Sequence, residues 1–152
     1  ALDAVCDARP DMFNHNLETV RRLFPYVRPG ASYQTSLEVL QFAANQGLRV
    51  KSGIMLGLGE TWSEIRLALA DLLAHGCRFL TLGQYLAPSG AHVPVARHLA
   101  PDEFDHWKAT ALAMGFTGVA SAPLVRSSYR AEAMLTSLTD AAPLAVHTCE
   151  AC

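Results

Sequence analysis

The chain has 152 residues, of which 51% are hydrophobic and 17% charged, and its formal net charge is −2. This length suits one ordinary domain with its own core. No apolar run reaches the roughly 18 residues that span a bilayer, and acidic and basic residues are interleaved instead of forming one basic face. We therefore expect a protein that is not secreted, does not cross a membrane and does not bind nucleic acid.

The four cysteines are scattered along the chain, at Cys6, Cys77, Cys149 and Cys152. A domain of this size does not need disulfides, so we expect reduced thiols in a reducing compartment. The terminal run CEAC is at most half of a metal knuckle, because no second Cys or His pair completes it. The sequence begins without a methionine, and we interpret it as a fragment or a processed product.

The elements expected in chain order begin with a short strand at 11–15. Three amphipathic helices follow, and each ends at a glycine before a run typical of a strand. The second helix begins at a capping box, in which Glu64 follows Thr61 by three residues. The expected helix and strand pairs are 37–44 with 48–56, 61–72 with 77–82, and 101–114 with 116–120.

This alternation of helices and strands predicts an α/β fold built from parallel βαβ units. Residues 86–100, which contain two prolines and a glycine, are expected to form a long irregular loop. A short helix is expected from 131, and residues 138–152 show little periodicity and should fray.

Ligand sites in parallel α/β proteins lie at the carboxyl ends of the strands, since the loops there vary while the sheet fixes their bases. This rule selects four polar or glycine-rich runs. They are 14–16, 57–60, 83–85 and 126–129.

The run from Gly57 to Glu60 has two interpretations. Its glycines allow backbone amides to approach a ligand, and Glu60 adds a carboxylate before a helix. Spacing alone favours the simpler account, a tight turn between strand and helix. A phosphate site is the alternative, although the lysine of a P-loop is absent.

The polar side chains at the other strand ends also allow two readings. Asn14 and Asn16 suit recognition of ribose hydroxyls or an amino-acid group, and Asn16 is equally suited to cap a following helical turn. Gln84 and Tyr85 offer hydrogen bonding and stacking to an aromatic ligand, whereas a tyrosine at a strand end is more often rim packing. His92 and His98 in the irregular loop are expected to be solvated or hydrogen-bonded, because they lack the spacing of zinc ligands.

Six strings in this order resemble lipoyl synthase, a radical S-adenosylmethionine family: FNHNLETV, VRPGASYQTSLEVL, KSGIMLGLGET, LTLGQYLAPS, DEFDHWKATALAMGF and APLVRSSY. The likeness spans about residues 11–130. It implies that residues 1–130 form the later strands and helices of a partial (β/α) barrel of the radical S-adenosylmethionine type. The short helix and a disordered tail would occupy 131–152.

The resemblance also implies a cofactor site. In the run from Gly53 to Glu60, the spaced residues Met55, Gly57 and Glu60 match the motif that orients the adenine end of S-adenosylmethionine. By the same resemblance, Asn14 and Asn16 match positions near the ribose and the amino-acid group. Gln84 and Tyr85 match positions where the backbone contacts adenine.

The RSSY run resembles the family motif whose serine ligates an auxiliary four-iron four-sulfur cluster. Ser128 is the assigned ligand and Ser127 its competitor, with Arg126 or Tyr129 as support. A serine ligand suits a cluster that is consumed as sulfur donor, because alkoxide matches iron less well than thiolate does.

The implied reaction inserts two sulfurs, at C6 and C8, into an octanoyl group that is amide-linked to a carrier-protein lysine. Its cofactors are S-adenosylmethionine, cleaved to the 5′-deoxyadenosyl radical, and two 4Fe-4S clusters. The partners are octanoylated lipoyl carrier domains and an electron donor such as a flavodoxin or ferredoxin. The implied location is the cytoplasm of a bacterium or the mitochondrial matrix of a eukaryote.

Departures from the family bear on activity. Its CxxxCxxC motif and second cysteine triplet both precede the matched region, and the chain contains neither. The loop APSGAHVP also lacks an expected Arg-His pair. We therefore expect no catalytic residue in this fragment and no activity from it alone. The alternatives are a non-catalytic truncated module that docks lipoyl carrier domains, a pseudogene product, or an unrelated α/β barrel enzyme that binds a sugar phosphate.

Overall fold

The computed structural model describes residues 1–128 of the chain. Helices and strands alternate through most of this part, which confirms the predicted α/β class. Its elements in chain order are α1 (Leu2–Asp7), β1 (Phe13–Asn14), α2 (Phe24–Val27), α3 (Tyr33–Asn45), β2 (Val50–Leu56), α4 (Trp62–Ala74), β3 (Phe79–Gln84), α5 (Pro101–Met114) and β4 (Gly118–Ser121).

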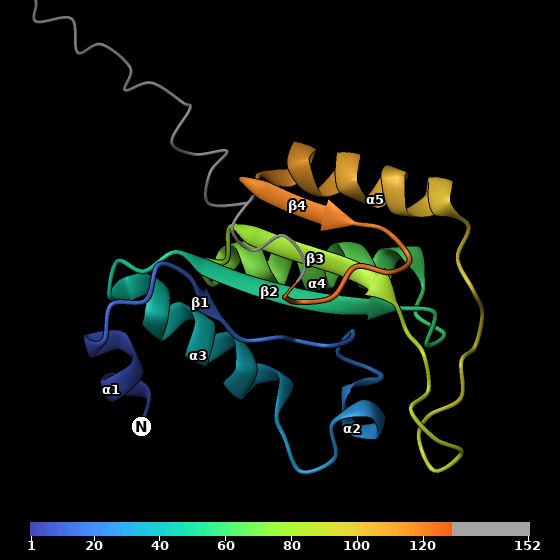
Figure 1. Cartoon of the computed structure of the whole chain (residues 1–152), viewed down its shortest axis with the longest axis horizontal. Helices are drawn as coiled ribbons and strands as arrows, with labels where there is room; N and C mark the ends of the chain where they lie inside the picture. The colour runs from blue at the N-terminus through green and yellow to red at the C-terminus, as the bar shows by residue number, and fades with distance from the viewer. Residues whose placement is uncertain (129–152) are drawn as a thin grey trace, which may run out of the picture.

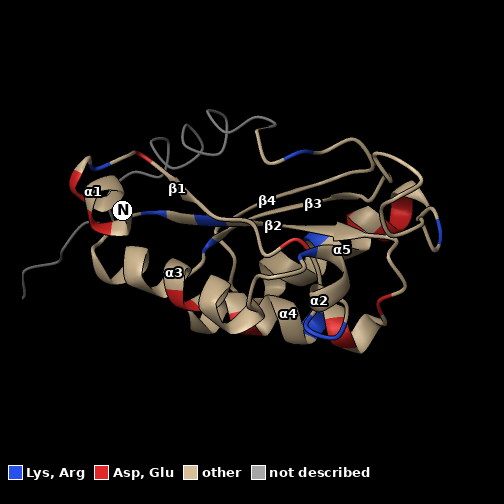
Figure 2. Cartoon of the chain, turned by 90° about the horizontal axis from the view of Figure 1, so that it is seen from below, with Lys and Arg blue, Asp and Glu red and all other residues tan. Residues whose placement is uncertain are grey.

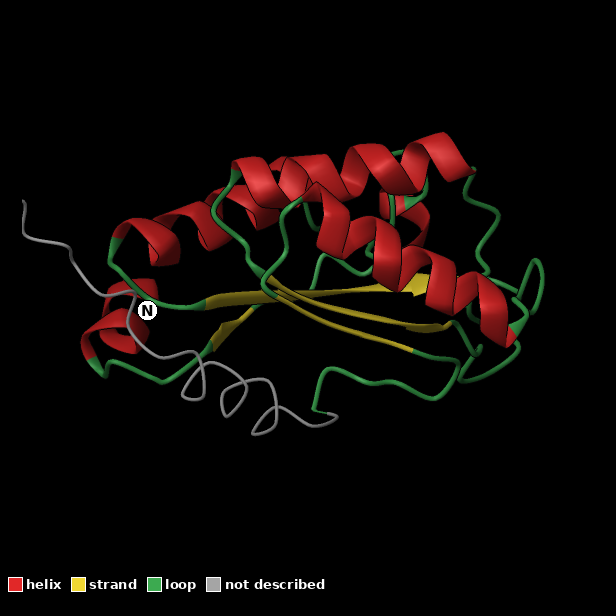
Figure 3. Cartoon of the chain, turned by 90° about the horizontal axis from the view of Figure 1, so that it is seen from above, coloured by secondary structure: helices red, strands yellow, loops and turns green. Residues whose placement is uncertain are grey.

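The strands form one parallel sheet in the order β1-β2-β3-β4 (Figure 1). The longest pairing joins β2 to β3, from Lys51 opposite Phe79 to Leu56 opposite Gln84. Helices α3, α4 and α5 all lie on the same face of the sheet (Figure 3). Sequential parallel strands with every crossover helix on one side form an arc of a (β/α) barrel, with the opposite face as the barrel interior.

The two faces of the sheet differ in composition because successive strand residues point to opposite sides. Toward the helices, Ile54 of β2 and Leu80 and Leu82 of β3 are at most 2% exposed and belong to the hydrophobic core. The core continues through the helices, where Leu69 and Trp107 are at most 1% exposed. The other face mixes apolar residues, such as Phe79 and Met55, with Lys51, Thr81 and the glycines Gly53 and Gly83, and the small residues leave room for the site.

Three strands begin two residues later than expected, and one motif accounts for all three. After α3, the Leu48 amide donates to the Ala43 carbonyl across Gly47, which has φ +78°. The same bond closes α4, from Cys77 to Leu72, and α5, from Phe116 to Ala111. This is a Schellman motif, so the first apolar residues after each glycine close a helix before the strand starts.

Other boundaries also differ from expectation. The strand expected at 11–15 is only Phe13–Asn14, and helices α1 and α2 are too short to show periodicity in the sequence. The irregular loop at 86–100 is confirmed, as is the capping box of Thr61 and Glu64. The helix and tail expected from 131 lie outside the described residues.

Charged residues of both signs are interspersed over the helices and loops of the described chain (Figure 2). Among residues 1–128, no helix is both long enough and apolar enough to cross a bilayer.

Candidate functional site

A cavity of about 230 Å³ opens on the barrel-interior face of β2 and β3. A second cavity of about 560 Å³ adjoins it, because Glu18 and Met55 line both. Together they lie over the carboxyl-terminal halves of the strands, where the strand-end rule places a ligand. The smaller cavity is lined by Asn16, Glu18, Gly53, Ile54, Met55, Thr81, Gly83, Val125, Arg126 and Ser127.

The two asparagines expected at the site differ in position. Asn14 is exposed on β1, whereas Asn16 lines the smaller cavity. The side-chain oxygen Oδ1 of Asn16 is buried without a hydrogen-bond partner, so the interpretation as a helix cap is wrong. A buried acceptor without a partner is costly, and a ligand hydroxyl or ammonium would satisfy it.

Hydrogen bonds from the two flanking amides fix Asn16 against β2, from His15 to the Lys51 carbonyl at 3.1 Å and from Leu17 to Ser52 Oγ at 3.0 Å. Gly53 has no side chain at this point, and a Cβ added there would lie 3.0 Å from Asn16 Oδ1. Arg28 Nη1 donates to the Asn16 carbonyl at 3.2 Å. Burial, followed by the nearby Arg28 charge, lowers the pKa of His15, whose Nε2 atom is buried without a partner. His15 is therefore neutral near pH 7.

The loop from Gly57 to Glu60 is a tight turn, as spacing favoured. Gly57 and Gly59 have φ of +102° and +99°. The Glu60 carboxylate accepts hydrogen bonds from the amides of Gly57, at 2.7 Å, and Leu58, at 2.9 Å. Because the carboxylate already occupies these amides, the loop offers them to no phosphate, which speaks against the sugar-phosphate alternative.

Gln84 ties the end of β3 to the loop that precedes α5. Its Nε2 donates to the carbonyls of Tyr85 and Arg97, both at 3.0 Å, and its Oε1 accepts from the Leu99 amide at 2.9 Å. Tyr85 is buried, lines the larger cavity and donates its hydroxyl to the Val93 carbonyl at 2.7 Å. Both side chains therefore shape the rim.

The two candidate serines lie close to the cavity but are placed differently. Ser127 lines it, and its carbonyl accepts a hydrogen bond from Lys51 Nζ. Ser128 is exposed, Arg126 contributes to the lining, and Tyr129 lies outside the described residues.

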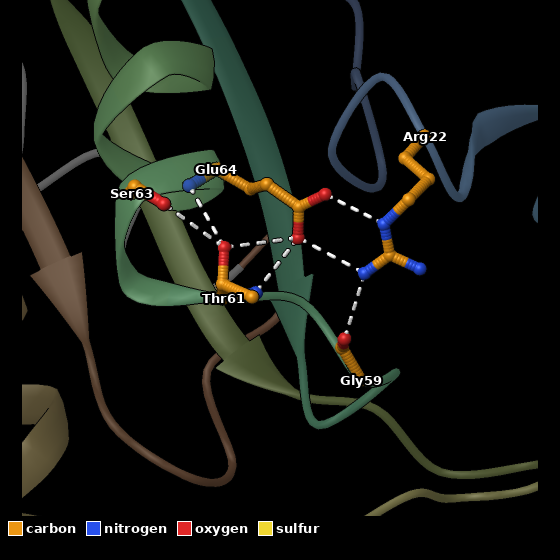
Figure 4. A network of polar contacts seen from close by, with 5 residues as sticks. All are labelled: Arg22, Gly59, Thr61, Ser63 and Glu64. Atoms are coloured by element: carbon orange, nitrogen blue, oxygen red, sulfur yellow. Dashed lines mark hydrogen bonds and ion pairs between the residues drawn. The ribbon is translucent and has the colours of Figure 1, made fainter.

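A network of hydrogen bonds and an ion pair holds the turn at residues 57–60 against the segment that contains Arg22. The guanidinium of Arg22 donates to both carboxylate oxygens of Glu64, at 2.6 and 3.0 Å, and to the Gly59 carbonyl at 2.9 Å (Figure 4). Glu64 also accepts from the Thr61 amide at 2.8 Å. These bonds link the segment after β1 to the start of α4. Of the expected histidines, His92 is hydrogen-bonded to Ser89 at 2.8 Å.

Sequence reasoning missed Glu18 and Lys51. Glu18 has φ +74°, which is uncommon for a residue other than glycine, and its amide and carbonyl bond Gly53 and Met55 at 2.9 and 2.8 Å. No local sequence signal marks a strained glutamate of this kind. Lys51 would have been found from its charge, since it is the single charged residue of the otherwise uncharged strand 50–56.

The described residues do not by themselves fit an iron–sulfur cluster, which requires several thiolates. Among residues 1–128, no group of three or more His, Cys, Asp or Glu side chains is placed to hold a metal ion. Cys6 and Cys77 are free and buried in the core, and burial raises the pKa of Cys77 to about 12. Cys149 and Cys152 lie outside the described residues.

Comparison with known proteins agrees with the geometry. Residues 1–72 match the Radical SAM superfamily. The chain is 56% identical over 134 residues to a lipoyl synthase of Methylococcus capsulatus, covering 87% of this chain and 42% of the relative. It is 53% identical over 131 residues to a lipoyl synthase of Phocaeicola vulgatus, covering 86% and 46%. The chain thus spans less than half the length of these relatives.

Proposed function

Because this chain belongs to the lipoyl synthase family of radical S-adenosylmethionine proteins, we propose that it is the C-terminal half of an enzyme that inserts two sulfurs into a protein-bound octanoyl group. The observation that carries the proposal is identity of 51 to 57% over 86 to 91% of the chain to lipoyl synthases. The parallel sheet, with helices on one face only, supports the same assignment. A sugar-phosphate enzyme does not account for this similarity, and the similarity does not favour a non-catalytic docking module.

The site fits S-adenosylmethionine on one specific feature, the unpartnered Oδ1 of Asn16 in the cavity wall. We infer that this oxygen accepts a hydrogen bond from a ribose hydroxyl or from the ammonium of the cofactor. Met55 and Tyr85 supply apolar walls. Gly57, Glu60 and the Gln84 side chain keep those walls in place through the bonds of the turn and the rim. Asn14 is proposed as a further contact from the exposed edge of β1.

Bound S-adenosylmethionine supplies the means to remove hydrogen from unactivated carbon once it is reductively cleaved. The chain's own contribution is to orient it at the carboxyl ends of β2 and β3 and to shield it from water. Ser128, with Ser127 as competitor, is proposed as a ligand of an auxiliary cluster. The thiolates of both clusters would come from outside the described residues, since Cys6 and Cys77 are committed to the core.

The proposed partners are octanoylated lipoyl carrier domains, because the reaction requires the octanoyl group on a carrier lysine. The reductive step requires an electron donor, for which a flavodoxin or ferredoxin is proposed. The isolated chain is expected to be inactive, because its described thiols are buried and cannot hold a reducing cluster.

The test uses the complete protein that contains this chain, reconstituted with iron and sulfide. An octanoylated carrier peptide should gain two sulfur atoms, read by mass spectrometry, and absence of any gain with wild-type protein would refute the function. Asn16→Ala should weaken S-adenosylmethionine binding about fivefold, since one hydrogen bond is worth about 1 kcal/mol. Asn45→Ala is the matched control, because Asn45 is exposed at the end of α3.

The serine assignment is tested separately in the same protein. Ser128→Ala should lower the iron content while S-adenosylmethionine cleavage stays measurable. If Ser127→Ala does this and Ser128→Ala does not, Ser127 is the ligand. Full iron content and normal sulfur insertion in both variants would show that neither serine binds the cluster.

A further inference from the structure

The segment that follows β4 turns back and crosses the barrel-interior face of the sheet. The Gln84 amide donates to the Pro123 carbonyl at 3.1 Å, and Lys51 Nζ donates to the Ser127 carbonyl. Lys51 pairs with Phe79 at the opposite end of β3 from Gln84. Residues 123–127 therefore run antiparallel to β3, on the side of the sheet away from the helices (Figure 3).

A glycine in β3 allows this close approach. A Cβ added to Gly83 would lie 2.2 Å from the Val125 carbonyl oxygen and 3.2 Å from Arg126 Nη1. A side chain at this position would have to push the backbone of the crossing segment away from the sheet. Gly83 has no positive φ to explain it, so the need for glycine here comes from the contact alone.

Lys51 makes the second contact that keeps residues 123–127 on the sheet, through its bond to the Ser127 carbonyl. Its side chain comes from the middle of the sheet, the residue is 1% exposed, and no salt bridge of the described residues includes it. An ammonium buried without an acidic partner is costly, and an apolar side chain of similar length would be at least as stable there. Stability therefore does not account for the lysine, whereas its bond to the Ser127 carbonyl does.

We propose that Lys51 and Gly83 are positioning residues that seat the Arg126-Ser127-Ser128 run in the wall of the cavity. The seating rests on the contacts above, and its consequence for sulfur insertion rests on the proposed function. With the seat intact, Ser127 lines the cavity together with Gly53 and Met55, and the exposed Ser128 follows it directly in the chain. Without it, the run would leave the sheet while the core on the helical face stays packed.

Limited trypsin digestion of the full 152-residue chain tests the seating, because cleavage after Arg126 requires the run to leave the sheet. Lys51→Met and Gly83→Ala should each speed cleavage after Arg126 at least tenfold, with fragments identified by mass spectrometry. The matched controls are Lys108→Met, at an exposed lysine of α5, and Gly90→Ala, where an added Cβ meets nothing within 4 Å. Both controls should stay within twofold of wild type.

Two outcomes would overturn the proposal. One is a rate after Arg126 in Lys51→Met within twofold of wild type. The other is faster cleavage at every basic residue in that variant, which would indicate a general loss of structure. If Gly83→Ala fails to fold by circular dichroism, Lys51→Met decides alone, since methionine keeps the stem packing.

In the complete enzyme, Lys51→Met should lower the rate of lipoyl formation at least tenfold while S-adenosylmethionine affinity stays within twofold. Equal losses in both, or a normal rate, would refute a positioning role. If wild-type enzyme forms no lipoyl group, the proposed function fails, and the digestion result still decides the seating.

Discussion

Replacing Gly57 by alanine tests whether the turn after β2 is held by contacts or only by backbone conformation. Gly57 has φ +102°, and a Cβ there would lie 2.4 Å from both the Arg97 carbonyl oxygen and Gln84 Nε2. The strained backbone costs about 1–3 kcal/mol. Displacing the Gln84 bond to Arg97 adds about 0.5–1.5 kcal/mol. We expect a total loss of about 1.5–4.5 kcal/mol in the free energy of unfolding.

Gly59 is the matched control for this experiment. It has nearly the same φ, +99°, but a Cβ there would meet only the Ala96 Cβ, at 3.7 Å. Gly59→Ala therefore carries the backbone cost without the clash. Urea unfolding of the 152-residue chain, followed by circular dichroism, measures both variants. If Gly57→Ala is no more destabilising than Gly59→Ala, the contact with Gln84 and Arg97 does not hold the turn.

Two further predictions concern ionisation. Hydrogen bonds from Arg22 and from the Thr61 amide lower the pKa of Glu64 to about 2, so the contribution of this carboxylate to stability is complete above its unfolded pKa near 4.5 and is lost as pH falls toward 2. Urea unfolding of Glu64→Gln should therefore show a flatter dependence of stability on pH over this range, and the difference from wild type should be small because the pair is exposed. Identical pH profiles for the variant and wild type would contradict the ion pair. Burial raises the pKa of Cys77 to about 12, so iodoacetamide at pH 8 should leave Cys77 unmodified in the folded protein and modify it in urea. Peptide mapping detects the modified residue. Rapid modification of Cys77 in the folded protein would show that this side chain is not in the core.

The residues expected at the cofactor site come from three strand ends, and the fold brings most of them to one edge. Asn16 and Met55 line one cavity, as the strand-end rule anticipates, and Ser127, the competing candidate for the cluster ligand, lines the same cavity. The roles of Gln84 and Glu60 did not follow from sequence. Their side chains bond their own or neighbouring loops, and such partners are known only once the loops are placed.

The sequence by itself determined the helix and strand succession, the capping box, the turn at Gly57 and the family, because each depends on local spacing or on an ordered set of motifs. Only the tertiary structure decided the short β1 and the return of residues 123–127 across the sheet. These depend on hydrogen bonds between residues far apart in the chain, such as Lys51 with Ser127, for which local periodicity carries no signal. The tertiary structure also decided that Asn16 Oδ1 has no hydrogen-bond partner, because this depends on which side chains pack around the atom.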